Sequence, residues 1–159
     1  MKIERAILIA FLGNYLVNNV VAAIAAFVPA GTGVITAQYI TFVVLAVILV
    51  AIMAWWYLKA VSSSMAMMAG LWFGVIGFVV SIAVAFITGV SGVLVQTASF
   101  STLISVLPNF GPFLLSWSTL VLLGYWVIPS VVLGWWMGRG RSSMPSPSVG
   151  GVSMPPRSM

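Results

Sequence analysis

The chain has 159 residues, of which 62% are hydrophobic and only 4% are charged, whereas a soluble domain carries roughly 25% charged residues. Because this small number of charged residues cannot cover a water-facing surface, the composition excludes a single soluble domain. It predicts an all-α integral membrane protein. The net charge of +5 does not indicate nucleic-acid binding, because the basic residues lie beside the predicted span ends or in the C-terminal tail and form no clustered face for phosphates.

The residue types that usually carry catalysis are almost absent. The chain contains no histidine, cysteine or aspartate, and its single carboxylate is Glu4. General acid–base catalysis, thiol chemistry and most metal sites depend on those types. Hydroxyls and amides alone could bind a lipid headgroup, but nothing here would activate a nucleophile. We therefore expect no enzyme, no metal site and no cofactor.

Residues 7–28 form the first predicted span. At 1.5 Å per residue this helix is about 33 Å long, enough for a hydrocarbon core of about 30 Å. Pro29, Gly31 and Gly33 end it, since proline and glycine disfavour helix continuation. A cleaved signal peptide, cut after residues 23–25, is the alternative. The apolar stretch is longer than the usual 7–15 residues of such a peptide, so we favour an uncleaved span.

Residues 36–58 form the second predicted span. Its middle is rich in valine, isoleucine and leucine and contains no polar residue. It ends with Trp55, Trp56 and Tyr57, followed by Lys59. Aromatic rings prefer the headgroup level, and a lysine extends its ammonium into water. This end therefore marks a membrane surface.

Residues 66–88 form the third predicted span, after a turn of three serines. Small residues recur along one helical face at spacings of four, three, four and four: Gly70, Gly74, Gly77, Ser81 and Ala85. Such a face lets another helix backbone approach closely. A single GxxxG pair is a weak dimerisation motif in a chain with 15 glycines, so we interpret the face as packing within one copy.

Residues 89–112 have no clear periodicity. They are uncharged but rich in small polar residues, mainly serine and threonine, and could form an external loop with an interfacial helix, a re-entrant segment or a weak fifth span. Four spans place Lys59, Arg139 and Arg141 on the same side as the basic N-terminus, as the positive-inside rule requires. We therefore predict four spans with an interfacial or re-entrant segment, and cytoplasmic termini in the cell membrane.

Residues 114–137 form the last predicted span, which closes a transmembrane domain of residues 1–137. Pro129 should bend this helix and free the carbonyl of Tyr125, four residues earlier. Residues 138–159 are dominated by proline, serine and glycine, so we predict a disordered cytoplasmic tail.

Three asparagines lie near the middle of the first span: Asn14, Asn18 and Asn19. An amide left unpaired in hydrocarbon costs several kcal/mol. At that depth the other spans offer few partners, namely Ser81, the Tyr125 hydroxyl and the Trp126 indole. We therefore predict that the first and fourth spans pack together and that Asn18 or Asn19 bonds to Trp126 or to the freed carbonyl.

The asparagines have three interpretations. They are interhelical contacts within one copy, contacts to another copy or a different membrane subunit, or the lining of a hydrated path. The sequence favours a non-catalytic accessory or structural subunit of a membrane assembly, in contact with the lipid bilayer and with another copy or other subunits. The alternative is a small oligomeric channel or facilitator for a neutral or weakly charged solute.

Overall fold

A computed structural model describes residues 3–29, 36–97, 104, 108 and 110–141. These residues form helices joined by short turns, and no strand occurs among them. Four helices are long and apolar enough to cross a membrane: Ile3–Ala26, Ala37–Leu58, Ser63–Gly92 and Trp117–Arg139. The predicted all-helical chain with four apolar, span-length helices is confirmed at this level.

The first long helix contains a widened turn at the asparagines. It consists of α1 (Ile3–Leu16), a π-helical turn η1 (Val17–Val21) and α2 (Ala22–Ala25). The backbone N–H of Ala22 reaches the carbonyl of Val17, five residues earlier. Single π turns inside α-helices occur frequently at functional sites.

The second and third long helices are joined by a tight turn. Helix α3 (Ala37–Leu58) begins at Thr36, whose hydroxyl accepts from the backbone N–H of Tyr39 at 3.1 Å, an N-cap that satisfies an otherwise unpaired donor. The 3₁₀ turn η2 (Ser63–Met65) leads into α4 (Ala66–Thr97).

Helix α4 continues nine residues beyond its predicted end at residue 88. The prediction of a separate segment starting at residue 89 was therefore wrong at its N-terminal end. Glycines interrupt the sequence there, but no proline breaks the helix, and glycine alone is tolerated in an apolar helix. Residues 98–103, 105–107 and 109 lie outside the described residues.

The fourth long helix starts later and ends later than predicted. Helix α6 (Phe110–Leu114) is separated by a short break from α7 (Trp117–Arg141). Helix α7 continues through Pro129 without interruption. Its last turn includes residues 138–141, which we had assigned to the disordered tail, and residues 142–159 lie outside the described residues.

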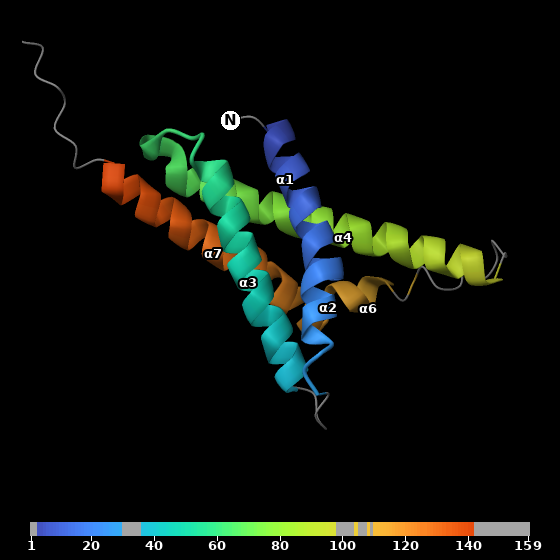
Figure 1. The fold of residues 1–159 in the computed structure, drawn as a ribbon. Coiled ribbons are helices and arrows are strands. Elements are labelled where there is room, and N and C mark those ends of the chain that lie inside the picture. Colours follow the sequence, from blue (N-terminus) through green and yellow to red (C-terminus); the bar gives the residue numbers. More distant parts are fainter. Residues whose placement is uncertain (1–2, 30–35, 98–103, 105–107, 109, 142–159) are drawn as a thin grey trace, which may run out of the picture.

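The four long helices form two pairs rather than a parallel bundle. In Figure 1, α1 and α3 run in similar orientations, whereas α4 crosses them at a wide angle and extends well beyond them. Helix α7 packs against α4 and α3, and α1 packs against α4 and α3. The first and fourth long helices meet in the core, where a Cβ on Gly13 would lie 3.1 Å from the Trp126 ring, although α1 packs more extensively against α4 and α3.

Glycines explain why α4 and α7 pack so closely. A Cβ on Gly74 would lie 2.8 Å from the Cα of Val127, and a Cβ on Gly134 would lie 2.6 Å from the carbonyl oxygen of Ala66. On Gly70 it would meet the backbone of Ser130. Only hydrogen atoms fit between these backbones, so the small-residue face of α4 lies against α7 within a single copy.

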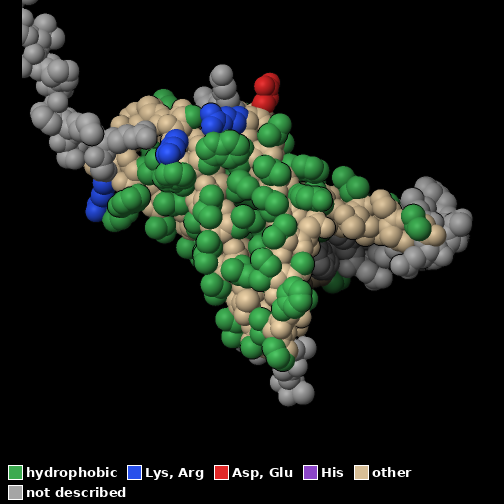
Figure 2. Space-filling model, viewed as in Figure 1, with side chains coloured by type: hydrophobic (Ala, Val, Ile, Leu, Met, Phe, Trp, Pro, Cys, Tyr) green, Lys and Arg blue, Asp and Glu red, His purple; other side chains and the backbone are tan. Residues whose placement is uncertain are grey.

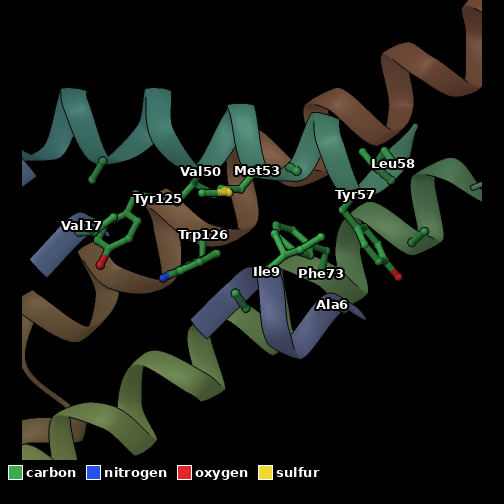
Figure 3. Packing of buried hydrophobic residues seen from close by; sticks show 14 residues of the cluster. Ala6, Ile9, Val17, Val50, Met53, Tyr57, Leu58, Phe73, Tyr125 and Trp126 are labelled. Carbon is green, nitrogen blue, oxygen red and sulfur yellow. The ribbon is translucent and has the colours of Figure 1, made fainter. Parts of the chain in front are cut away.

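The core is built around the Trp126 indole, which is fully buried (Figure 3). Phe73 meets it edge-on at a centroid distance of 6.1 Å, and Tyr57 stacks on Phe73 at 5.0 Å. A Cβ on Gly77 would overlap the indole. The absence of a side chain on Gly77 thus makes room for the largest residue of the core.

The outer surface is apolar, apart from one end. Hydrophobic side chains cover most of the face in Figure 2, and the Lys and Arg side chains gather at one end of the molecule. There the Lys59 Nζ lies 3.7 Å from the centroid of the Trp55 ring. The Cζ atoms of Arg139 and Arg5 lie 3.9 Å and 5.9 Å from the ring centroids of Trp135 and Trp56, respectively. A cation over an indole ring is favourable, and increasingly so as water is excluded.

Candidate functional site: an amide-lined cleft between α1 and α4

The three asparagines lie together on the wall of a cleft of about 540 Å³. The first long helix forms one side and the C-terminal half of α4 forms the other. The lining residues are Phe11, Asn14, Tyr15, Asn18, Asn19, Val84, Ala85, Thr88 and Gly89. Ala85, predicted to join the helix-packing face, lines this cleft, whereas Ser81 is buried.

Local hydrogen bonds hold the asparagines in place. The Asn18 amide donates to Oδ1 of Asn14 at 3.1 Å, and the Asn19 amide donates to the carbonyl of Tyr15 at 2.8 Å. Both bonds join residues four apart, which face each other on a helix. Asn14 is buried, whereas Asn18 and Asn19 are exposed at the π turn. The π turn thus presents two amides to the cleft.

Most of the hydrogen-bonding capacity of these amides is unused. Each amide has two donor hydrogens and two acceptor sites. Asn18 and Asn19 each donate one hydrogen, and no bond to either Oδ1 occurs within the part of the chain that the structure describes. Outside water, this leaves polar groups that require a ligand, a water or another polypeptide.

The predicted bond between the asparagines and Trp126 was wrong. The Trp126 indole N–H is buried and has no hydrogen-bond partner among the described residues. Its ring lies in the core against Gly13 of α1, whereas the Asn18 and Asn19 amides bond within their own helix, to Asn14 and to the carbonyl of Tyr15. Local side chain–backbone bonds compete effectively with distant partners.

The other predicted polar residues of α7 also lie in the core. The Tyr125 ring is buried and tilted against Trp126 at 6.3 Å. Next to Pro129, the Ser130 hydroxyl donates to the Trp126 carbonyl at 2.7 Å. The Ser81 hydroxyl is buried and has no partner within the described residues. None of these residues lines the amide cleft.

The α4 side of the cleft extends beyond α7. The two helices are antiparallel, with Gly77 level with Trp126. Trp117, the first residue of α7, is therefore level with Phe86, and about eleven residues of α4 lie beyond it, which is about 16 Å of helix. We call residues 87–97 the α4 overhang. A Cβ on Gly89 or Gly92 would have nothing within 4 Å.

Phe11, Tyr15 and Thr88 were missed by the sequence analysis. Phe11, Tyr15 and Asn19 are spaced four apart, which places them on one face of the helix. That spacing could have identified the first two residues. Thr88 could not be found this way, because the crossing of α4 over α1 decides which of its residues face the amides.

The cleft offers neutral hydrogen-bonding groups only. Its polar side chains are three amides and the hydroxyls of Tyr15 and Thr88. Such a set can bind an amide, a hydroxyl or a backbone carbonyl, and it contains no group with the basicity of a general base near neutral pH. No protein family, characterised protein or solved structure matches this chain.

Proposed function

We propose that this chain is a non-catalytic subunit of a membrane assembly, and that the amide cleft receives a transmembrane helix of another subunit or of a second copy. The observation that carries the proposal is the pair of exposed amides, Asn18 and Asn19, which line an open cleft together with residues of α4 and whose acceptor atoms form no bond within the described residues.

The energetics favour a helix as the occupant. An unpaired polar group in hydrocarbon costs several kcal/mol, whereas an interhelical hydrogen bond in a membrane contributes about 0.6 kcal/mol on average and up to about 1.7. Gly89 leaves open space on the α4 wall, so an incoming backbone can approach closely. Ile87 and Val95 on the overhang are 61% and 84% exposed and would gain packing partners.

We further propose that the chain lies in the cell membrane with both termini in the cytoplasm. The support is the common end of Arg5, Lys59 and Arg139, each beside a tryptophan ring. Basic residues are enriched on the cytoplasmic side, and tryptophan is enriched at the headgroup level. The apolar outer surface suits a lipid environment.

The decisive experiment is to block the cleft without disturbing the fold. Gly89→Leu adds a side chain where nothing lies within 4 Å and replaces glycine by a better helix former, so the isolated chain should unfold at a denaturant concentration no lower than that of the wild type. After mild detergent extraction from the native membrane, native mass spectrometry should show the wild-type chain in a stoichiometric complex. The variant should lose at least nine-tenths of that partner.

A second variant tests the amides themselves. Asn18→Leu with Asn19→Leu should release the partner to a similar extent, because the bonding groups are gone. Thr41→Val is the matched control, since the Thr41 hydroxyl bonds to its own helix at Ala37 and lies outside the cleft. The proposal would be contradicted if the partner stays bound to both cleft variants. It would also be contradicted if the wild-type chain is extracted as a monomer.

A small oligomeric channel or facilitator is the second candidate. It is favoured by the gathering of three amides with Thr88 on one cleft. The fully buried Trp126 fills the centre of a single copy, so a path would require several copies joined around the clefts. Solute flux in proteoliposomes that Asn18→Leu reduces would favour this function, and a foreign stoichiometric subunit would favour the first.

A further inference from the structure

A second cavity, of about 550 Å³, lies at the basic end of the molecule. It is bounded by the start of α1, the end of α3, the following turn and the start of α4. Its lining includes Arg5, Tyr57, Ser62, Met65, Met68 and Trp72. It shares no residue with the amide cleft, so its role is independent of the proposed docking function.

One wall of this cavity is polar and lacks a counter-charge. Arg5 lines it, and the recorded partner of its guanidinium is the Trp56 ring at 5.9 Å. Among the described residues Arg5 has no ion-pair partner. An arginine beside a concave site presents several donors in a fixed planar arrangement that matches phosphate oxygens.

The same cavity is also lined by Tyr57, whose buried hydroxyl is an unused hydrogen-bond donor in the described part of the chain. Tyr57 is 2% exposed, and its hydroxyl has no hydrogen-bond partner within the described residues. Stacking on Phe73 at 5.0 Å fixes the ring, and in Figure 3 its oxygen lies at the outer edge of the core cluster. A buried hydroxyl without a partner is costly, so a bound acceptor would remove that cost.

Another part of the lining is an apolar strip from the end of η2 along the start of α4. Met65, Met68 and Trp72 are spaced three and four residues apart, which places them on one helical face. All three are at least half exposed. Methionine side chains adapt their shape to flexible apolar partners, and the strip leads away from the basic end along the apolar outer surface.

We propose that this cavity binds one anionic phospholipid, with the phosphate against Arg5 and Tyr57 and an acyl chain along Met68 and Trp72. The guanidinium and the Tyr57 hydroxyl donate to phosphate oxygens. The joint presence of a cationic donor, an orphaned donor and an adjoining apolar strip distinguishes a lipid site from a site for free phosphate. Anionic lipids are concentrated in the cytoplasmic leaflet, which this end faces in the orientation proposed above.

The test uses the full chain in an uncharged detergent and titrates it with phosphatidylglycerol, with native mass spectrometry as the readout of bound lipid. Diacylglycerol with the same acyl chains lacks the phosphate, and inorganic phosphate lacks the chains. We expect one phosphatidylglycerol per chain, retained at least tenfold more tightly than diacylglycerol, and no competition by inorganic phosphate at equal concentration.

Matched variants separate the cavity from general surface charge. Arg5→Gln should weaken phosphatidylglycerol binding roughly tenfold, because it removes a charge-assisted hydrogen bond. Lys59→Gln removes the same charge from the same end of the molecule, but Lys59 lies outside the cavity, so binding should change less than twofold. Tyr57→Phe keeps the stacked ring and should weaken binding of phosphatidylglycerol but not of diacylglycerol.

Four results would overturn the proposal. Equal losses in Arg5→Gln and Lys59→Gln would mean diffuse attraction to the basic end. Equal affinity for diacylglycerol would show that the phosphate contributes nothing to binding. Effective competition by inorganic phosphate would show that the acyl chain contributes nothing. Unchanged binding in Tyr57→Phe would exclude the hydroxyl, and this variant remains informative even if Arg5→Gln folds poorly.

Discussion

Alanine substitutions at two glycines of α4 test how tightly this helix packs against α7. A Cβ on Gly74 would lie 2.8 Å from the Cα of Val127 and 3.0 Å from the carbonyl oxygen of Trp126, whereas a Cβ on Gly89 would have nothing within 4 Å. Both positions belong to the same helix, so the helix-forming advantage of alanine over glycine, about 0.8–1.0 kcal/mol, applies to both and cancels in their difference.

The remaining difference comes from overpacking. To accommodate the methyl group at Gly74, the two backbones must separate by roughly half an ångström, and forced expansion of a close-packed site typically costs about 1–3 kcal/mol. We expect Gly74→Ala to be about 2 kcal/mol less stable than Gly89→Ala, and about 1 kcal/mol less stable than the wild type.

The assay is reversible unfolding in mixed micelles, in which the mole fraction of a denaturing detergent is raised and helix content is followed by circular dichroism. Gly134→Ala, whose Cβ would lie 2.6 Å from the Ala66 carbonyl oxygen, should be destabilised by a similar amount from the α7 side. Equal midpoints for Gly74→Ala and Gly89→Ala would refute the close backbone packing of α4 and α7.

Three further predictions use the same unfolding assay. Gly77→Ala should destabilise the chain by about 1–3 kcal/mol. A double-mutant cycle should show that Trp126→Leu removes most of this cost, because the three atoms nearest to the added methyl group all belong to the indole, and additive losses would contradict this. Ser130→Ala should cost about 1 kcal/mol, since it deletes a buried bond of 2.7 Å to a backbone carbonyl, and a cost above about 3 kcal/mol would indicate a wider role. Asn19→Leu should change the stability of the isolated chain by less than about 1 kcal/mol, because its bond to Tyr15 is exposed, and a larger loss would make Asn19 a fold-stabilising residue.

Composition and charge placement were sufficient to predict the four long helices. Four apolar stretches of span length are visible directly in the sequence, and their ends coincide with prolines, serines or tryptophans. The glycine spacing on α4 was equally informative, because close backbone approach requires small residues at three- and four-residue intervals. Each of these signals lies within a single stretch of the chain, so it can be recognised in one sequence without knowledge of how the helices pack.

The helix arrangement was not predictable from the same information. The prediction that Asn18 or Asn19 bonds to Trp126 or to the freed carbonyl compared depths along helices placed side by side, whereas in the structure α4 crosses α1 and Trp126 is enclosed in the core. The continuation of α4 past residue 88 was missed because serine and glycine there resembled a loop. Apolar surroundings favour helix for almost any uncharged sequence, since backbone groups must be paired internally.

The length of α4 has a consequence for the bilayer around it. The stretch Ser63–Gly92 has 30 residues, or about 45 Å of helix, against a hydrocarbon core of about 30 Å. In the membrane position proposed above, an apolar helix this long would relieve hydrophobic mismatch by tilting, and the wide angle at which α4 crosses α1 beside the amide cleft (Figure 1) is compatible with such a tilt. A thicker bilayer requires less tilt. Membrane thickness would then influence the angle between α4 and α1, and through it the width of the amide cleft.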